Sequence, residues 1–332
     1  LRSDSTRAVE GAILTFAGSG LPDARNRLGS ELAHRIRHAW RALLCLHALG
    51  PPDDRLEDRF LRIAVSDAIA RNWSLAFFLL ESTEEGAVMR SVEKALRFAT
   101  ARSRGNALEV LSNLGDRETA RLMVLMAEPG PVSDKLGSLG ERFEVPTDAE
   151  GARALAREST NRWIRTSFAL DVMEGAERDA LEDTMEKLLA LKQVPLFAHF
   201  SLEQLEAITR VTRDLVCHDG QKIVDEGATG GELYVVLAGR VHVYKNHGTA
   251  DELDLGTLER GSYFGEMAIF DSRPRSATVV AEDEARLLVL AGDRLKDFVM
   301  QTPEMSFQIF EVLTTRIREV EARLDSTLRA RS

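Results

Sequence analysis

The sequence predicts an α+β chain with two domains of different class, a stack of α-helices followed by a small antiparallel β-barrel or jelly roll. The chain has 332 residues, 44% of them hydrophobic and 29% charged, which is enough to bury two cores. Apolar residues recur at helical spacing from about residue 30 to residue 188, and at strand spacing after residue 210. The three tryptophans lie before residue 190 and the three tyrosines after it. We therefore expect one domain over residues 1–188 and a second over residues 189–332.

Charge and cysteine content exclude several classes of function. The chain carries 43 Lys and Arg against 53 Asp and Glu, a net charge of -10, which argues against binding of nucleic acid through a broad basic surface. Two cysteines without a CxxC pair indicate neither a disulfide framework nor a thiolate metal site, and they fit a reducing compartment. His34 and His38 lie one helical turn apart without a third ligand, so no metal site is expected. No P-loop, GxSxG, HExxH or GxGxxG motif is present, and we expect no enzyme activity.

The first domain is predicted to be an irregular helical repeat. Apolar stripes such as Leu32, Ile36 and Trp40 alternate with short breakers. Residues 104–111 and 161–170 share a polar start and an apolar stripe, which is typical of the second helix of a helical hairpin. This pattern predicts an α-solenoid of the HEAT kind, with a loop from Gly130 to Pro146 that separates two hairpins.

The second domain is predicted to contain short strands between flanking helices. A helix over residues 185–192 precedes it, and Ser201 with Gln204 forms the capping box of another helix. A long helix opening at Pro303 and reaching Leu324 follows it. The predicted strands, separated by turns, are residues 233–237, 241–244, 253–258, 277–281 and 287–290.

Residues 261–279 carry the candidate site. They predict a strand, a glycine turn, one short helical turn and a basic loop that enters another strand. A helix beginning near Gly265 presents unpaired N–H groups and the positive end of its dipole to an anion. Arg275 can close on the same anion, Ser276 adds a hydroxyl donor, and Glu266 supplies an acceptor for a sugar hydroxyl. The pattern therefore predicts binding of an anion joined to a ribose.

These residues also resemble a known family. Phe264-Gly265-Glu266-Met267-Ala268 and Pro274-Arg275-Ser276-Ala277-Thr278-Val279 are similar to the phosphate-binding cassette of cyclic-nucleotide-binding domains, and the resemblance covers about residues 190–325. It implies an eight-stranded β-roll with flanking helices, a pairing of Arg275 with the cyclic phosphate, and a bond from the ribose 2′-hydroxyl to Glu266. It also implies that the backbones of Gly265, Met267, Ser276 and Ala277 line the sugar-phosphate. The ligand-binding residues it implies are Phe264, Gly265, Glu266, Met267, Ala268, Arg275, Ser276, Ala277 and Arg316.

Arg316 belongs to the final predicted helix and shares a face with an apolar stripe of Ile309, Leu313, Val320 and Leu324. In the ion-channel members of the family an arginine at a similar place caps the purine, which makes Arg316 a candidate base contact. A salt bridge to Glu319 or Glu321 is the alternative. We expect cAMP ahead of cGMP as the ligand, although the hydroxyl of Ser276 is compatible with both.

The position of these segments suggests a context. Residues 104–109 and 162–165, which precede the cyclic-nucleotide-like part, resemble the cytosolic HEAT-like tail of bacterial transporters of the major-facilitator or ATP/ADP-carrier type. The resemblance implies a transmembrane transporter as the upstream or associated partner, and a cytoplasmic location at the inner membrane. The expected function is cyclic-nucleotide sensing that controls this partner. The alternative is a degenerate, non-binding domain that acts as a scaffold or forms a homodimer through the C-terminal helix.

Overall fold

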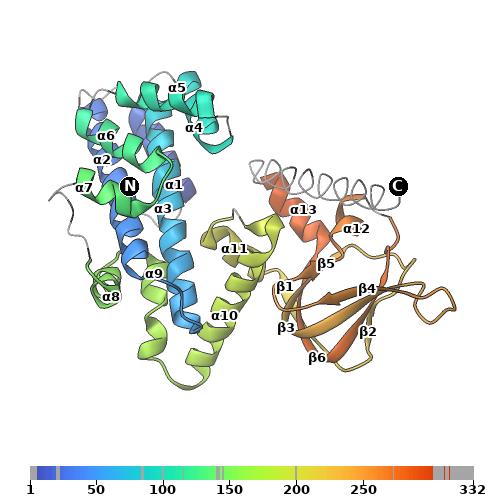
Figure 1. Ribbon diagram of the computed structural model, residues 1–332. Helices are drawn as coiled ribbons and strands as arrows, with labels where there is room; N and C mark the ends of the chain where they lie inside the picture. The colour runs from blue at the N-terminus through green and yellow to red at the C-terminus, as the bar shows by residue number, and fades with distance from the viewer. Residues whose placement is uncertain are drawn as a thin grey trace, which may run out of the picture. The chain divides into compact units, whose positions relative to one another are not determined.

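The chain forms two compact units, residues 1–174 and residues 175–332 (Figure 1). The computed structural model describes residues 6–19, 23–83, 86–98, 101–114, 116–139, 143, 146–198, 200–271, 273–301, 310 and 314. The boundary that we expected after residue 188 lies inside a helix, α10 (Gly175–Gln193). Helical periodicity continues across this region, and the apolar pattern alone does not tell which unit a helix packs against.

The first unit is helical, as predicted. Its two longest helices, α2 and α3, pack against each other, and shorter helices pack around them. The helices of this unit are α1 (Thr6–Ala17), α2 (Ala24–Ala48), α3 (Leu56–Thr83), α4 (Gly86–Phe98), α5 (Ala101–Ser112), α6 (Arg117–Ala127), α7 (Val132–Leu139), α8 (Ala149–Arg157), α9 (Arg162–Thr166) and the 3₁₀ turn η2 (Ala169–Asp171).

Two local expectations for the helical unit are corrected. The predicted loop from Gly130 to Pro146 contains helix α7, whose Leu139 is buried in the core. The sequence did not predict this helix because its glycines and serines are typical of loops. The segment 161–170, expected as one helix, is divided into α9 and η2, whereas the segment 104–111 lies within α5 as predicted. Asn161 caps α9 by accepting from the backbone N–H groups of Trp163 and Ile164.

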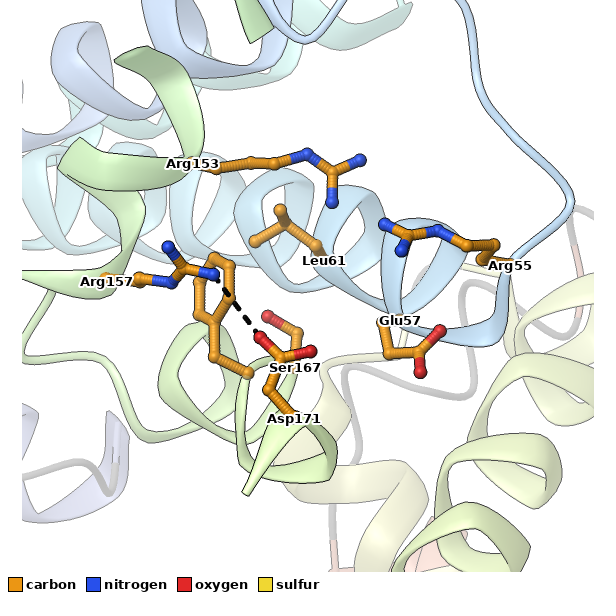
Figure 2. A pocket seen from close by; sticks show the side chains of 8 residues that line it. Arg55, Glu57, Leu61, Arg153, Arg157, Ser167 and Asp171 are labelled. Carbon is orange, nitrogen blue, oxygen red and sulfur yellow. Dashed lines mark hydrogen bonds and ion pairs between the residues drawn. The ribbon is translucent and has the colours of Figure 1, made fainter. Parts of the chain in front are cut away.

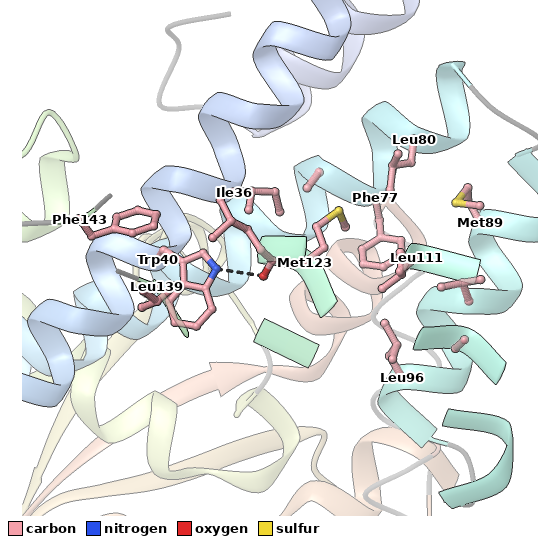
Figure 3. Close-up of a cluster of buried hydrophobic side chains, with 14 of the residues drawn as sticks. Ile36, Trp40, Phe77, Leu80, Met89, Leu96, Leu111, Met123, Leu139 and Phe143 are labelled. Carbon is pink, nitrogen blue, oxygen red and sulfur yellow. Dashed lines mark hydrogen bonds between the residues drawn. The ribbon is translucent and has the colours of Figure 1, made fainter. Parts of the chain in front are cut away.

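The core of the helical unit is built on α2 (Figure 3). Ile36, Trp40 and Leu44 are fully buried there against Phe77 and Leu80 of α3. The indole Nε1 of Trp40 donates to the carbonyl of Leu122 over 3.0 Å, which gives its buried polar atom a partner. This packing confirms that the tryptophan stripe of α2 is a core feature.

A buried carboxylate connects three segments of the same unit. Asp58, in the first turn of α3, is 1% exposed. It accepts from Nε of Arg62 at 2.6 Å and from Nη2 of Arg153 on α8 at 2.5 Å. The remaining donors of Arg62 bind the carbonyls of Leu49, Gly50 and Pro51 at the end of α2. Beside this cluster lies a cavity of about 90 Å³ toward which Arg55, Arg153 and Arg157 point (Figure 2).

One helix of the described part is long and apolar enough to cross a membrane, as judged by length and composition. This stretch is Leu56–Ser82, and 44% of its most apolar part is buried inside the protein. It is the central helix α3, which packs against α1, α2, α4 and α9 and carries the buried Asp58. The core helix of a protein outside the membrane can have the same length and composition, so these properties do not assign α3 to a membrane.

The second unit joins lead-in helices to an antiparallel sheet. Among the described residues, six strands form the sheet in the order β1-β6-β3-β4, with β2 paired to β6 and β5 paired to β3. The elements are α10, the 3₁₀ turn η3 (Pro195–Phe197), α11 (Leu202–Thr209), β1 (Thr212–Cys217), β2 (Lys222–Val224), β3 (Glu232–Lys245), β4 (Leu253–Leu258), β5 (Tyr263–Phe264), α12 (Glu266–Asp271), β6 (Thr278–Ala291) and α13 (Gly292–Gln301). The predicted capping box of Ser201 and Gln204 is present at the start of α11.

The resemblance implied eight strands, and the structure contains two long ones in place of four short ones. The expected strands 233–237 and 241–244 are continuous in β3, and those at 277–281 and 287–290 are continuous in β6. Gly239, predicted as a turn, is the point where β3 shifts register. It has a φ of 73°, and a Cβ there would lie 2.2 Å from the carbonyl oxygen of Glu284, so only glycine fits without displacement of the backbone. A glycine therefore marks a bend within a strand as readily as a turn between two strands.

An ionic network fixes α10 to the sheet of this unit. Lys187 binds Asp183 at 2.8 Å and Asp214 of β1 at 2.9 Å, and Arg286 of β6 contacts the same two carboxylates. Burial opposes ionisation of Asp183 and Asp214, but the hydrogen bonds from Lys187 and Arg286 outweigh it and hold the pKa of both carboxyls below the ordinary value of 3.8. Both acids are therefore charged in the folded protein at neutral pH.

We expect this network to make the second unit sensitive to acid. Because the folded pKa is lowered, the contribution is present above about pH 4 and is lost as the pH falls through the folded value. Urea unfolding at pH 6 and at pH 3.5 should show a smaller drop in stability for Asp183→Asn than for the wild type. An equal drop in both proteins would show that the network contributes nothing to folding.

Candidate functional site

Arg275 is the centre of the candidate site. It lies in the loop between α12 and β6 and is 7% exposed, although an arginine in a polar loop is ordinarily solvated. Its Nη1 donates to the carbonyl of Glu232 at 3.0 Å and to that of Gly265 at 3.1 Å. Within the described part of the chain no carboxylate pairs with Arg275, and Nε and Nη2 have no hydrogen-bond partner. The side chain is therefore held by two backbone carbonyls, and its Nε and Nη2 donors can still bind a ligand.

Two glycines make room for this guanidinium. A Cβ at Gly230 would lie 3.0 Å from Nη2 of Arg275, and one at Gly265 would lie 2.5 Å from Nη1. Gly265 also has a φ of 86°, in the left-handed region that disfavours other residues. Gly265 is predicted from the sequence as a site residue, whereas Gly230 belongs to the loop before β3 and is not. The Gly230-Gly231 pair is the signal that would have indicated it.

An aromatic pair lies beneath the arginine. The ring of Tyr234 stacks on Phe264 with centroids 4.8 Å apart, and Cζ of Arg275 lies 5.7 Å from the centre of the tyrosine ring. Phe264 therefore supports the site through Tyr234, which sequence reasoning did not select. The positions lie 30 residues apart, and the pairing of β3 with β5 brings them together.

The carboxylate of Glu232 makes its hydrogen bonds to residues other than Arg275. The hydroxyl of Tyr234 donates to it at 2.6 Å, and Arg213 of β1 binds it at 3.0 Å. The hydrogen bond from Tyr234 lowers the pKa of Glu232, and burial together with this bond raises the pKa of Tyr234 to about 12. The acid therefore stays ionised, and its charge acts on Arg275 electrostatically without a direct ion pair between them in the described residues.

The backbone on either side of Arg275 presents donors. Gly227 N donates to the carbonyl of Arg275, and Arg275 N donates to the carbonyl of Ala228, both at 2.9 Å. The N–H groups of Ser276 and Ala277, by contrast, have no partner within the described residues. Two such N–H groups next to a guanidinium with unused donors are the type of donors with which backbone nests bind anions.

The other predicted residues surround this loop. Glu266 begins α12 and is half-buried, and Met267 is exposed. Ala268 belongs to the same short helix. Of the predicted final helix the structure describes residues 310 and 314, both helical, and Arg316 lies outside the described residues. The two segments, at the end of β5 and before the start of β6, are connected by the hydrogen bond from Arg275 to the carbonyl of Gly265.

Comparison with known proteins defines the class of the sheet-containing second unit, which we call the β-unit. Residues 215–302 match the family model of the cyclic nucleotide-binding domain, and this part of the chain is such a domain. The match includes the segment 264–277 described above.

Named relatives fall in the same part of the chain. The Cyclic AMP receptor protein of Thermus thermophilus is 29% identical over 135 residues, which are 41% of this chain and 62% of the relative. A cAMP-dependent protein kinase regulatory subunit of Mycosarcoma maydis is 30% identical over 159 residues, 46% of this chain and 29% of the relative. The crystal structure of Thermus thermophilus Catabolite Activator Protein covers 40% of this chain and 62% of its own, with 28% identity and a TM-score of 0.37. The chain thus spans less than two thirds of the length of these relatives.

Proposed function

We propose that the β-unit binds a cyclic nucleotide, with cAMP preferred to cGMP, and that binding regulates a partner. The observation that carries the proposal is the buried guanidinium of Arg275, fixed by two carbonyls, with Nε and Nη2 unused. A guanidinium buried without a carboxylate is costly, and a bound phosphodiester would offset that cost. The names of the relatives, a cAMP receptor and a cAMP-dependent kinase subunit, favour the same ligand class.

Each residue has a role in this proposal. Arg275 and the N–H groups of Ser276 and Ala277 bind the cyclic phosphate, each charge-assisted hydrogen bond contributing roughly 1.5–3 kcal/mol. Glu266, at the start of α12, accepts from the ribose 2′-hydroxyl, and the backbones of Gly265, Met267 and Ala268 lie along the sugar. Phe264 keeps Tyr234 under the guanidinium. Arg316 contacts the base.

The partner in the proposal is a membrane transporter, in the same or in an associated chain at the cytosolic face of the inner membrane. The helical unit acts in it as a HEAT-like adaptor. This part rests on the resemblance of residues 104–109 and 162–165 to transporter tails. A tagged chain that is expressed in cells containing the transporter should sediment with the membrane fraction. Recovery in the soluble fraction alone would contradict a transporter in an associated chain.

Calorimetric titration of the chain tests ligand binding. We expect one cAMP per chain, weaker binding of cGMP, and no measurable heat with adenosine, which has the base and ribose but lacks the phosphate. Sedimentation with and without cAMP accompanies the titration. If neither cyclic nucleotide gave heat and the chain formed a dimer whose sedimentation did not change with either, the proposal would be contradicted and the non-binding dimerisation module would be favoured.

A further inference from the structure

We propose that Lys245, at the end of β3, is a positioning residue that orients the phosphate-binding backbone at Ser276 and Ala277. This inference rests on the proposed function, because it concerns how the same site is kept in shape. The two cassette motifs at residues 264–268 and 274–279 do not include Lys245, which lies 31 residues before Ser276 in the chain.

The contacts of Lys245 reach the cassette directly. Its Nζ donates to the carbonyl of Ser276 at 2.9 Å and binds Oε1 of Glu226 at 2.6 Å. The other oxygen of Glu226 accepts from the backbone N–H of Asn246 at 2.7 Å. The Glu226 carboxylate therefore holds both the ammonium and the backbone at the end of β3, and the hydrogen bond from Lys245 lowers the pKa of this acid. The ammonium thus binds a carboxylate and the Ser276 carbonyl at the same time.

Peptide geometry connects this carbonyl to the ligand side. The carbonyl of Ser276 and the N–H of Ala277 belong to one peptide unit, and in a trans peptide they point in opposite directions. The described part of the chain has no cis peptide bond. A lysine that binds the carbonyl on one side therefore directs the N–H of Ala277 to the other side, where none of the described residues accepts from it.

The preceding peptide unit is held in the same way. The carbonyl of Arg275 accepts from Gly227 N, so the N–H of Ser276 points away from the turn at residues 226–228. The N–H of Glu226 donates to Oγ1 of Thr278, which attaches that turn to the start of β6. Two consecutive peptide units of the cassette are thus set from outside the ligand site, one by the backbone of the turn and the other by Lys245.

The test compares variants of the full chain by calorimetric titration with cAMP. Lys245→Met is expected to weaken binding about 5-fold, because the lost hydrogen bond is exposed to solvent and acts on the phosphate only through the peptide unit that it orients. Lys245→Arg keeps a donor and a positive charge and should restore most of the affinity. Lys222→Met is the matched control, because Lys222 of β2 pairs with Asp225 three residues further along the chain, and its side chain is 53% exposed against 42% for Lys245. The change removes the same positive charge.

Unfolding midpoints separate positioning from support of the fold. A positioning role predicts a wild-type midpoint for Lys245→Met together with weakened binding. Glu226→Gln, which keeps the shape of the side chain but loses its charge, should weaken binding in the same direction. Wild-type affinity in Lys245→Met, or an equal loss in Lys222→Met, would overturn this inference and leave the proposed function standing. Absence of cAMP binding by the wild type would overturn both.

Discussion

Replacement of Arg275 by alanine is expected to lower the affinity for cAMP by about 100-fold or more. At least two charge-assisted hydrogen bonds to the phosphate are lost, and together they correspond to roughly 3–6 kcal/mol. Arg275→Lys keeps the charge but has no planar fork, and its affinity should lie between those of the wild type and the alanine variant. Calorimetric titration of the three proteins measures the effect.

Two controls accompany this prediction. Arg273→Ala removes a neighbouring exposed arginine of the same loop and should leave binding within about 3-fold of the wild type, as is usual for an exposed charge. The midpoint of thermal unfolding reports whether Arg275→Ala keeps the fold, since Glu232 and Gly265 lose a donor to their carbonyls. Undiminished affinity in a folded Arg275→Ala protein would contradict the assignment of the phosphate site.

Replacement of Asp58 by alanine is expected to destabilise the helical unit by about 3–5 kcal/mol. Arg62 and Arg153 would both lose a carboxylate that is 1% exposed, and a buried ion pair that loses one member leaves an uncompensated charge. Arg62 also binds the carbonyls that end α2, so the change affects the contact between α2 and α3. Denaturant unfolding monitored by tryptophan fluorescence follows this unit, which contains the three tryptophans.

Asp53→Ala provides the comparison for the same cluster. Asp53 approaches Arg55 at 3.4 Å and Arg153 at 3.6 Å, and its side chain is 46% exposed. Its removal should cost no more than about 1 kcal/mol, because exposed ion pairs contribute little. Equal losses for the two variants would show that burial does not determine the strength of this cluster.

The part of the site that sequence reasoning could reach is local. Gly265, Glu266, Arg275 and Ser276 lie within 12 positions of one another, and the requirements of a tight turn and a short helix connect them along the chain. The glycine at positive φ and the helix that begins directly after it follow the expected order. Local backbone requirements leave a clear mark in a sequence.

The remaining part of the site depends on strand pairing. The contact from Arg275 to the carbonyl of Glu232 spans 43 positions, and a carbonyl acceptor does not depend on the identity of its side chain. Tyr234 belongs to a continuous apolar run and Lys245 to the polar end of the same strand, and only the register of β3 against β5 and β6 brings them to the cassette. The sequence predicts four short strands where the structure has the long strands β3 and β6, for a related reason. An apolar run interrupted by glycine fits both a bend within a strand and a turn between strands.

A crystal structure of the chain grown with cAMP tests the central claim most directly. The account predicts density for the cyclic phosphate within hydrogen-bond distance of Nε or Nη2 of Arg275 and of the N–H groups of Ser276 and Ala277, with the ribose beside Glu266. A nucleotide bound elsewhere, with Arg275 still facing only the carbonyls of Glu232 and Gly265, would contradict it.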